Sequence, residues 1–188
     1  MFKEKCFFEE KVFSRNHKFS FKEDVELINL ILSFKRTGKI LDLGCGEGGN
    51  SLKLAEKGFK VTCIDISRTA INALKKEAVK RKTKIKIVCQ DIDDLELKEC
   101  FDVIIITGVI HFLEKNIKSF IRKIKQKTNK EGFNILDVFL TDSKCQENSK
   151  GRYFSKGEII KMYSDWKIIK HSIYKENQNK SEFAVFQK

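Results

Sequence analysis

The chain has 188 residues, 41% of them hydrophobic, which is enough for one globular domain with an apolar core and excludes an intrinsically disordered chain. Its formal net charge is +12, but only six of the 38 basic residues are arginine and the lysines are dispersed, which favours a solvated basic surface over a dedicated nucleic-acid interface. No apolar run reaches the roughly 18 residues of a membrane helix, and the opening MFKEKCFFEEKVFS lacks the apolar core of a signal peptide, so we expect a cytoplasmic protein without membrane contact.

Six cysteines are scattered through the chain without a C-x-x-C pair, and the chain is longer than the small secreted domains that depend on disulfides. We therefore expect reduced thiols and no metal site. Cys63 and Cys89 lie inside apolar strand patterns, where a thiol behaves as a small hydrophobic side chain. Each stands two residues before an acid that ends its strand, which predicts that the two thiols lie side by side on neighbouring strands.

The first half of the chain alternates predicted helices and strands. A capping box, Ser20 with Glu23, predicts a helix over about 21–35 whose apolar residues recur at helical spacing. The apolar stretch KILDLG predicts a strand that leads into a glycine-rich turn and a short helix. A second strand, KVTCIDI, precedes a helix that Ser67 caps and that runs to about Arg81.

The second half continues the alternation with KIKIVCQDI and FDVIIITG as the third and fourth strands. The stretch NIKSFIRKIKQKT predicts a helix, Gly132 is expected to end that connection, and FNILDVFL predicts a fifth strand. A second capping box, Ser155 with Glu158, predicts a helix, and WKIIKHSIY and EFAVFQK predict two last strands with no helix between them. The pattern indicates an α/β fold with a parallel sheet and an antiparallel pair at one edge.

The segment ILDLGCGEGGN places a glycine-rich turn between the first strand and the following helix, where backbone can approach a ligand closely. The spacing also satisfies G-x-G-x-x-G, a weak signal that a dinucleotide-binding fold shares. Asp42 distinguishes a cationic ligand from a dinucleotide, because a carboxylate at the strand end repels a pyrophosphate and attracts a cation. S-adenosylmethionine carries an ammonium and a sulfonium, so we expect it to bind at Asp42, Gly44, Cys45 and Gly46.

Two further acids follow the second and third predicted strands. Asp65 is expected to accept hydrogen bonds from the ribose hydroxyls of this ligand, and Asp91 to meet the adenine amino group. Ile66 and Ile92 come directly after these acids and are expected to sandwich the adenine ring. Three acids at the carboxyl ends of three successive strands lie where α/β sheets bind their ligands.

These motifs resemble those of class I S-adenosylmethionine-dependent methyltransferases over nearly the full length of the chain. The resemblance rests on ILDLGCGEGG, Asp65, QDI and the late segment YFSKGEIIKMYSDWKIIKHS. Within that superfamily the chain is most similar to the tellurite-resistance TehB-like branch, through LDLGCGEGGNSLKLAEKGFKVTCID and FDVIIITGVIHFLEKNIKSFIRKIKQKTNKEGFNIL.

The resemblance implies a Rossmann-like sandwich with a seven-stranded, mostly parallel sheet of order 3-2-1-4-5-7-6, strand 7 antiparallel and helices on both faces. It implies a single domain over 1–188, with residues 1–36 forming an N-terminal lid segment and a helix packed on the domain. The implied cofactor is S-adenosylmethionine, with S-adenosylhomocysteine as the product.

The chain departs from the TehB-like pattern near its end. That branch carries a longer hairpin before the last strand, with a His-Arg pair implicated in the active site, whereas YKENQNKSEF has neither residue. The resemblance therefore implies methyl transfer to a small molecule and leaves open whether the acceptor is a soft nucleophile such as a thiol, tellurite or selenite.

Candidate residues near the transferable methyl group of the cofactor lie at and after the end of the fourth strand. The resemblance implies that backbone near Thr107 lines the methionine end of the cofactor. His111 is the candidate catalytic base or polarising group, and the alternative is a wall residue without a chemical role.

Four further residues are candidates for lid or substrate contacts. Arg15 and His17 precede the first helix, and Arg152 and Tyr153 follow the fifth strand. For Arg15 and His17 the alternative is an exposed terminal turn.

Three rival functions remain. The basic charge makes an RNA methyltransferase the runner-up. Methyltransferases of DNA or of glutamine amino groups are set aside, because they commonly carry an Asn/Asp-Pro-Pro-aromatic motif after the fourth strand and the chain has no proline. A protein that binds S-adenosylmethionine without catalysis is the second rival, and an NAD-dependent dehydrogenase, which Asp42 disfavours, is the third.

Overall fold

The computed structural model of the chain describes residues 18, 20–113, 116–141, 151–176 and 179–188. They fall into two compact units, Met1–Leu95 and Glu96–Lys188. The assignment of residues 1–188 to one domain, with 1–36 as lid and helix, stays a prediction.

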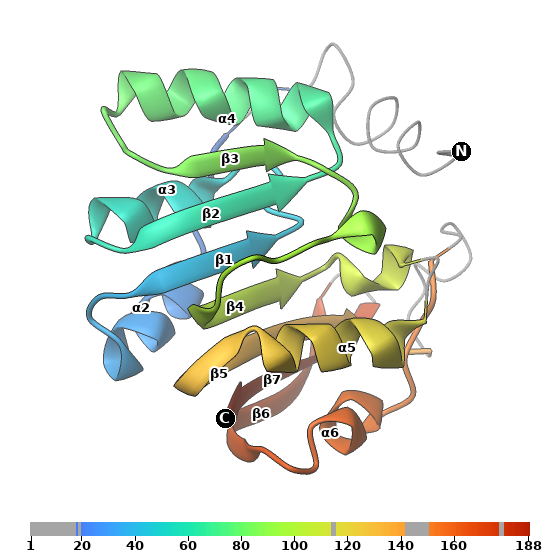
Figure 1. Cartoon of the computed structure of the whole chain (residues 1–188). Helices are drawn as coiled ribbons and strands as arrows, with labels where there is room; N and C mark the ends of the chain where they lie inside the picture. Colours follow the sequence, from blue (N-terminus) through green and yellow to red (C-terminus); the bar gives the residue numbers. More distant parts are fainter. Residues whose placement is uncertain (1–17, 19, 114–115, 142–150, 177–178) are drawn as a thin grey trace. The chain divides into compact units, whose positions relative to one another are not determined.

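The strands form a seven-stranded sheet of order β3-β2-β1-β4-β5-β7-β6 (Figure 1). Strand β7 runs antiparallel to both β5 and β6, whereas β1 with β2, β2 with β3, and β4 with β5 are parallel. The predicted fold class, strand order and single antiparallel strand are confirmed.

The described residues of the first unit form three parallel strands and three α-helices. The strands are β1 (Lys39–Leu43), β2 (Lys60–Asp65) and β3 (Lys86–Cys89). The helices are α2 (Val25–Phe34), α3 (Gly49–Glu56) and α4 (Arg68–Lys80), and a 3-10 turn, η2 (Ile92–Asp94), follows β3. All residues of β1 and β2 after the first are buried, which explains their nearly continuous apolar sequences.

Helix α4 forms where the sequence predicts it. The Ser67 hydroxyl accepts a hydrogen bond from the N–H of Ala70 at 3.1 Å, as an N-cap side chain does. Its buried face consists of four residues at helical spacing: Ala70, Ile71, Leu74 and Ala78.

Helix α2 begins four residues later than the capping box predicts. The N-cap is Asp24, whose side chain accepts from the N–H of Leu27 at 3.0 Å. Ser20 is instead held by Glu47, a residue 27 positions further along the chain. A tertiary contact has therefore replaced the predicted local cap.

The predicted pairing of Cys63 with Cys89 is wrong by two residues. Strands β2 and β3 are parallel neighbours, but Cys63 lies in register with Ile87, and Cys89 with Asp65. Strand β3 ends at Cys89, so Asp91 lies just beyond the strand and not at its last residue.

In the second unit, the part that the structure describes forms the remaining four strands and two α-helices. The strands are β4 (Phe101–Thr107), β5 (Thr128–Phe139), β6 (Lys167–Glu176) and β7 (Asn179–Gln187). The helices are α5 (Ile117–Gln126) and α6 (Glu158–Met162), and a 3-10 turn, η3 (Ile110–Phe112), follows β4. Gly132 lies inside β5 and does not end the preceding helical connection, because the strand already begins at Thr128.

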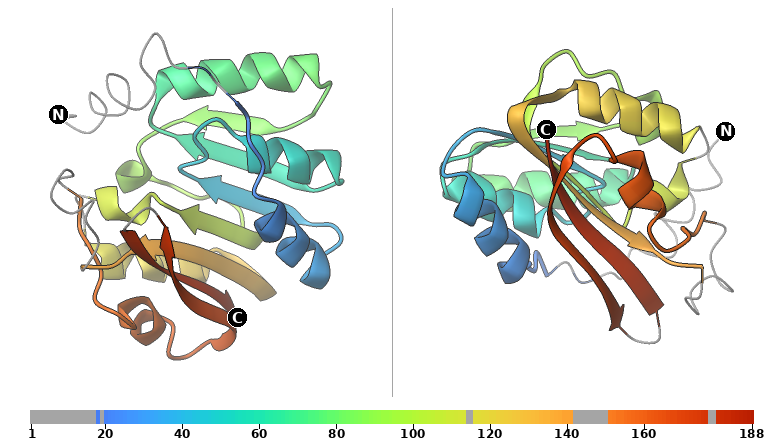
Figure 2. Two further views of the ribbon diagram at one scale, coloured as in Figure 1. Left: turned by 180° about the vertical axis from the view of Figure 1, so that it is seen from behind. Right: turned by 90° about the horizontal axis from the view of Figure 1, so that it is seen from below.

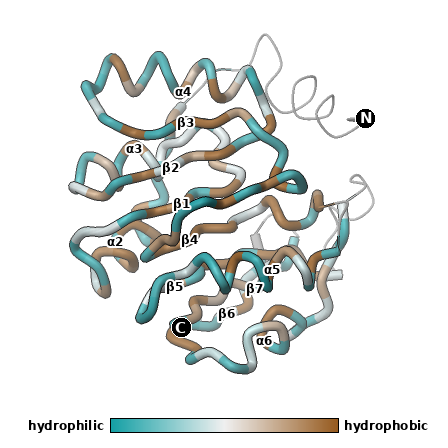
Figure 3. Tube along the Cα trace, viewed as in Figure 1, coloured by the Kyte–Doolittle hydropathy of each residue, from teal (hydrophilic) through white to brown (hydrophobic). Residues whose placement is uncertain are grey.

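Helix α5 is amphipathic, as its alternating hydropathy in Figure 3 shows. Its buried residues are the four predicted ones: Ile117, Phe120, Ile121 and Ile124. Next to α6, the ring of Tyr163 stacks on Phe186 of β7 with centroids 4.1 Å apart, and its hydroxyl accepts a hydrogen bond from Asn134 of β5 at 2.9 Å. Helix α6 begins later than the second capping box predicts, because its N-cap is Gly157 and not Ser155. The Ser155 N–H still donates to the Glu158 carboxylate at 3.0 Å, which is one of the two hydrogen bonds of the predicted box.

Within the described part of the chain, no helix combines the length and apolar character needed to cross a lipid bilayer.

Candidate active site

The glycine turn after β1 brings a buried carboxylate to the end of that strand. Asp42 is only 5% exposed and accepts a hydrogen bond of 2.6 Å from the Ser51 hydroxyl of α3. Burial raises the pKa of Asp42 to about 6, against the lowering effect of that hydrogen bond. A buried carboxylate with a raised pKa is stabilised in its ionised form by a cation, so this position favours a positively charged ligand.

Asp65 connects the end of β2 to the glycine turn. One carboxylate oxygen accepts from the N–H of Gly46 at 2.8 Å and the other from the N–H of Ser67 at 2.8 Å. Gly46 has a φ of 53°, in the left-handed region that glycine adopts without strain. Asp65 therefore fixes the conformation of the turn in addition to presenting a carboxylate at the carboxyl edge of the strands.

The third predicted acid lies at the same edge of the first unit. The N–H of Gln90 donates to the carbonyl oxygen of Asp65 at 3.0 Å, which brings the chain after β3 against the end of β2. Asp91 follows directly and caps η2 through the N–H of Asp93 at 2.9 Å. Ile92 is buried and Ile66 is half-buried. The structure thus places the residues predicted for the ribose and adenine side by side in one unit.

Cys45 of the turn adjoins Cys63 of β2. The N–H of Cys45 donates to the Ile64 carbonyl at 3.2 Å. The hydrogen bond between the two thiols, together with burial, raises the pKa of Cys45. Neither cysteine is in a disulfide.

Glu47 is a residue of the turn that the sequence argument missed. Its carboxylate accepts from the N–H of Ser20 at 2.9 Å and from the N–H of Phe21 at 2.8 Å. Figure 2 (left) shows the segment before α2 passing α3, and a Cβ atom on Gly49 would come within 2.2 Å of the Lys22 carbonyl oxygen. The turn therefore holds the segment that leads into α2. The sequence did contain a signal for this contact: Glu47 stands between the glycines of GCGEGG, and a turn that faces only solvent does not require an acid there.

In the second unit, Thr107 is the last residue of β4 and lies in register with Asp137 of β5. The carboxylate of Asp137 accepts a hydrogen bond of 2.7 Å from the Tyr174 hydroxyl of β6. Neither Asp137 nor Tyr174 was among the predicted site residues. Asp137 had the same signal as Asp65 and Asp91, an acid near the carboxyl end of an apolar strand.

His111 has both ring nitrogens in hydrogen bonds to backbone. Nδ1 lies 3.0 Å from the carbonyl oxygen of Arg152, and Nε2 accepts from the N–H of Phe139 at 3.2 Å. The ring also stacks on Phe139 with centroids 4.7 Å apart and is 3% exposed. This pattern requires the neutral tautomer with the proton on Nδ1 and supports the interpretation of His111 as a wall residue over that of a base.

We expect His111 to make the free energy of unfolding fall as the pH drops. Burial lowers the pKa of His111 from 6.5 to about 4, so between these values the unfolded chain binds a proton that the folded chain excludes. The contribution, about 3 kcal/mol at most, is complete above pH 6.5 and is lost on acidification towards pH 4.

Denaturant titration gives the free energy of unfolding of the wild type and of His111→Phe across this pH range. The difference between the two proteins, as a function of pH, measures the contribution of His111. The raised pKa of Asp42 gives an opposite slope in both proteins and cancels. A difference that does not change with pH would contradict the prediction.

Four residues were predicted to contact the substrate or to form a lid, and the structure describes two of them. Tyr153 is buried, with its ring 6.1 Å from that of His111. Arg152 forms an ion pair with Glu158, and its guanidinium lies 5.1 Å from the Phe154 ring centroid. Arg15 and His17 lie outside the described residues.

The model of the family described as tellurite resistance protein TehB matches residues 1–182. The chain belongs to the TehB family. Over 158 residues it is 32% identical to a probable S-adenosyl-L-methionine-dependent methyltransferase TehB of Haemophilus influenzae, which covers 78% of this chain and 55% of that relative. The chain thus spans about half the length of the curated TehB relatives that it matches.

Other similarities agree with this family and fold. The crystal structure of TehB from Haemophilus influenzae superposes with a TM-score of 0.78 at 25% identity, covering 98% of this chain and 66% of that one. A ubiquinone biosynthesis O-methyltransferase of Rickettsia typhi is 36% identical over 100 residues, which are 53% of this chain and 40% of that relative. The TehB-like resemblance and the class I methyltransferase fold are confirmed.

Proposed function

We propose that this TehB-family chain transfers the methyl group of S-adenosylmethionine to a small, soft nucleophile. The observation that carries the proposal is the pair of carboxylates around the glycine turn, one buried at the end of β1 and one bonded to the turn at the end of β2. The TehB relative of Haemophilus influenzae is described as dependent on the same cofactor.

The residues of the first unit fit this cofactor. The cationic end of S-adenosylmethionine would relieve the penalty on ionised Asp42, whereas the pyrophosphate of NAD would increase it. A carboxylate accepts about four hydrogen bonds, so Asp65 can bind ribose hydroxyls while holding the two backbone N–H groups. Ile66, Asp91 and Ile92 would hold the adenine.

The cofactor, when bound, supplies a methyl group on a good leaving group. The protein has to align the acceptor and exclude water, and for a hard nucleophile it also has to remove a proton. The backbone hydrogen bonds of His111 leave neither ring nitrogen for that proton. This favours an acceptor that reacts without a strong base, such as a thiolate or a chalcogen oxyanion.

A second candidate function is transfer to a hydroxyl group. It is favoured by the Asp137–Tyr174 hydrogen bond, because a carboxylate beside a phenol can accept the proton of an acceptor hydroxyl. The resemblance to a ubiquinone biosynthesis O-methyltransferase agrees with this alternative.

An acceptor screen with radiolabelled S-adenosylmethionine tests both functions. It covers thiols, selenite, tellurite, catechols and bulk RNA, and runs with the wild type and Asp137→Asn. The first proposal expects turnover of thiols or chalcogen oxyanions with little loss in Asp137→Asn. The second expects catechol turnover that falls roughly 10²–10⁴-fold in the variant. Turnover of RNA alone, or tight binding of the cofactor without turnover of any acceptor, would overturn both.

A cytoplasmic setting also belongs to the proposal. It is supported by Cys45, Cys63, Cys89 and Cys100, which are free thiols in the described part of the chain.

A further inference from the structure

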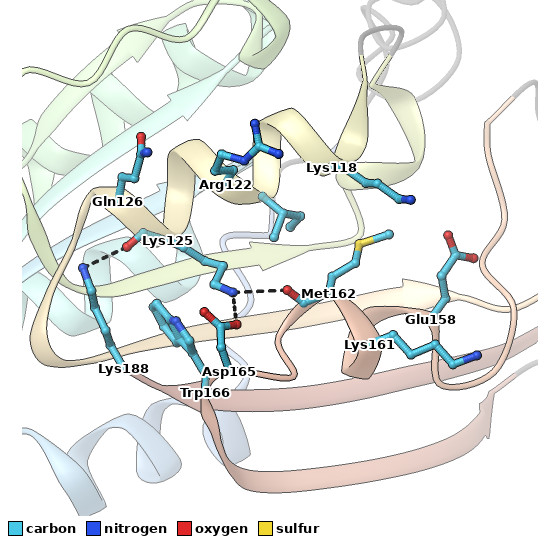
Figure 4. A pocket seen from close by; sticks show the side chains of 11 residues that line it. Lys118, Arg122, Lys125, Gln126, Glu158, Lys161, Met162, Asp165, Trp166 and Lys188 are labelled. Carbon is cyan, nitrogen blue, oxygen red and sulfur yellow. Dashed lines mark hydrogen bonds and ion pairs between the residues drawn. The ribbon is translucent and has the colours of Figure 1, made fainter.

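A groove lies between α5 and α6, within Glu96–Lys188 (Figure 4). Its volume is about 780 Å³, within the range of roughly 300–1,000 Å³ that is usual for small-molecule sites. The lining residues are Lys118, Ile121, Arg122, Lys125, Gln126, Glu158, Lys161, Met162, Asp165, Trp166 and Lys188. None of them belongs to the residues proposed for the cofactor or the acceptor, so the inference does not rest on the proposed function.

The groove is enriched in positive charge. Five of its eleven lining residues are lysine or arginine, compared with 38 of the 188 residues of the whole chain. General lysine richness of the chain therefore does not account for the concentration of charge at this place.

The two acids of the groove are already neutralised. Asp165 forms an ion pair with Lys125, which lowers the pKa of Asp165. Glu158 forms an ion pair with Arg152, which is not part of the lining.

Three cations of the groove have no carboxylate partner among the described residues: Lys118, Arg122 and Lys161. All three are exposed. The groove therefore presents uncompensated positive charge from both helices.

The remaining wall is apolar and its shape is fixed by contacts. Ile121 is buried, and Met162 and Trp166 are half-buried. The Lys125 ammonium lies 5.5 Å from the Trp166 ring centroid and donates to the Met162 carbonyl at 3.3 Å, so it connects α5 to α6. An indole and a thioether form a surface suited to a flat aromatic group.

We propose that the α5–α6 groove binds an organic polyphosphate with an aromatic body, of the nucleotide type. Its phosphates would lie against Lys118, Arg122 and Lys161, because ammonium and guanidinium groups form charge-assisted hydrogen bonds with phosphate oxygens. Its ring would lie on Met162 and Trp166. Charge and shape together select this ligand over a simple anion, which has no use for the apolar wall, and over an uncharged ring.

The experiment is calorimetric titration of the full chain with ATP, with tripolyphosphate and with adenosine. Saturating S-adenosylhomocysteine is added so that the adenosine moiety of ATP does not compete for the proposed cofactor site. Trp166 is the only tryptophan of the chain, so its fluorescence reports whether a ligand enters the groove.

The expected result is saturable binding of ATP with a change in tryptophan emission, and weaker binding of tripolyphosphate and adenosine. The double variant Lys118→Ala/Lys161→Ala should lose about 100-fold in ATP affinity, about tenfold for each charge-assisted contact. The matched control Lys75→Ala/Lys76→Ala removes the same charge from exposed positions of α4 and should keep the wild-type affinity.

Several results would overturn the proposal. They are no saturable ATP binding, equal losses in the two double variants, and equal affinity for ATP and tripolyphosphate, which would show an inorganic polyanion site. Binding of single-stranded RNA without binding of ATP would likewise overturn it.

Discussion

Replacement of Asp65 by alanine will weaken the binding of S-adenosylmethionine by about 30- to 700-fold. The reason is the loss of charge-assisted hydrogen bonds to the ribose, which together contribute about 2–4 kcal/mol. The change also removes the acceptor for the N–H groups of Gly46 and Ser67, so the glycine turn loses the contacts that fix it.

Calorimetry of the purified variant measures this loss. Asp65→Asn keeps the size of the side chain and should show an intermediate loss. Asp94→Ala removes one negative charge from the same unit at an exposed position and should bind like the wild type. Wild-type affinity in a folded Asp65→Ala protein would exclude Asp65 from the binding site.

Replacement of Asp42 by asparagine will have opposite effects on binding and on stability. The folded-state pKa is raised from 3.8 to about 6, so the stability of the folded chain falls as the pH rises from 3.8 to about 6, and the full penalty of the ionised carboxylate is present above pH 6. At pH 8 the neutral amide should therefore raise the free energy of unfolding by up to about 3 kcal/mol. The amide oxygen can still accept from the Ser51 hydroxyl, so the packing at this position is retained.

The same change should weaken cofactor binding by about 30-fold or more, because the carboxylate that faces the cation is lost. In the wild type, a bound cation favours the ionised form of Asp42, so binding near pH 6 should release protons and the affinity should rise from pH 5 to pH 7. Calorimetry in buffers of different ionisation enthalpy measures that release. Asp42→Asn should show no such pH dependence, and equal proton release in both proteins would contradict the role of Asp42.

The mostly parallel sheet and the acids of the first unit were predictable because they depend on patterns along the chain, whereas the strand order was implied by the family resemblance. Apolar strands that alternate with amphipathic helices encode a mostly parallel sheet, and the acids that follow such strands fall at one edge. The N-cap of α4 was equally predictable, because the hydrogen bond between Ser67 and Ala70 lies within one helical turn.

Features that depend on contacts across the sequence were not predictable in this way. Glu47 binds the Ser20 that a local rule assigns to a cap, and the N-cap of α2 is Asp24. Periodicity identifies a strand but not its register with the neighbouring strand. The sequence therefore could not predict that Cys89 lies beside Asp65 and not beside Cys63. The role of His111 depends on carbonyl and N–H groups from Arg152 and Phe139, which no residue pattern specifies.

The contacts of Glu47 with Ser20 and Phe21 imply a thermodynamic linkage between two events. The turn proposed to hold the cofactor and the segment that leads into α2 share one carboxylate, so ordering either one lowers the entropic penalty for ordering the other. By reciprocity, whatever factor cofactor binding adds to the stability of that segment, the docked segment adds the same factor to cofactor affinity.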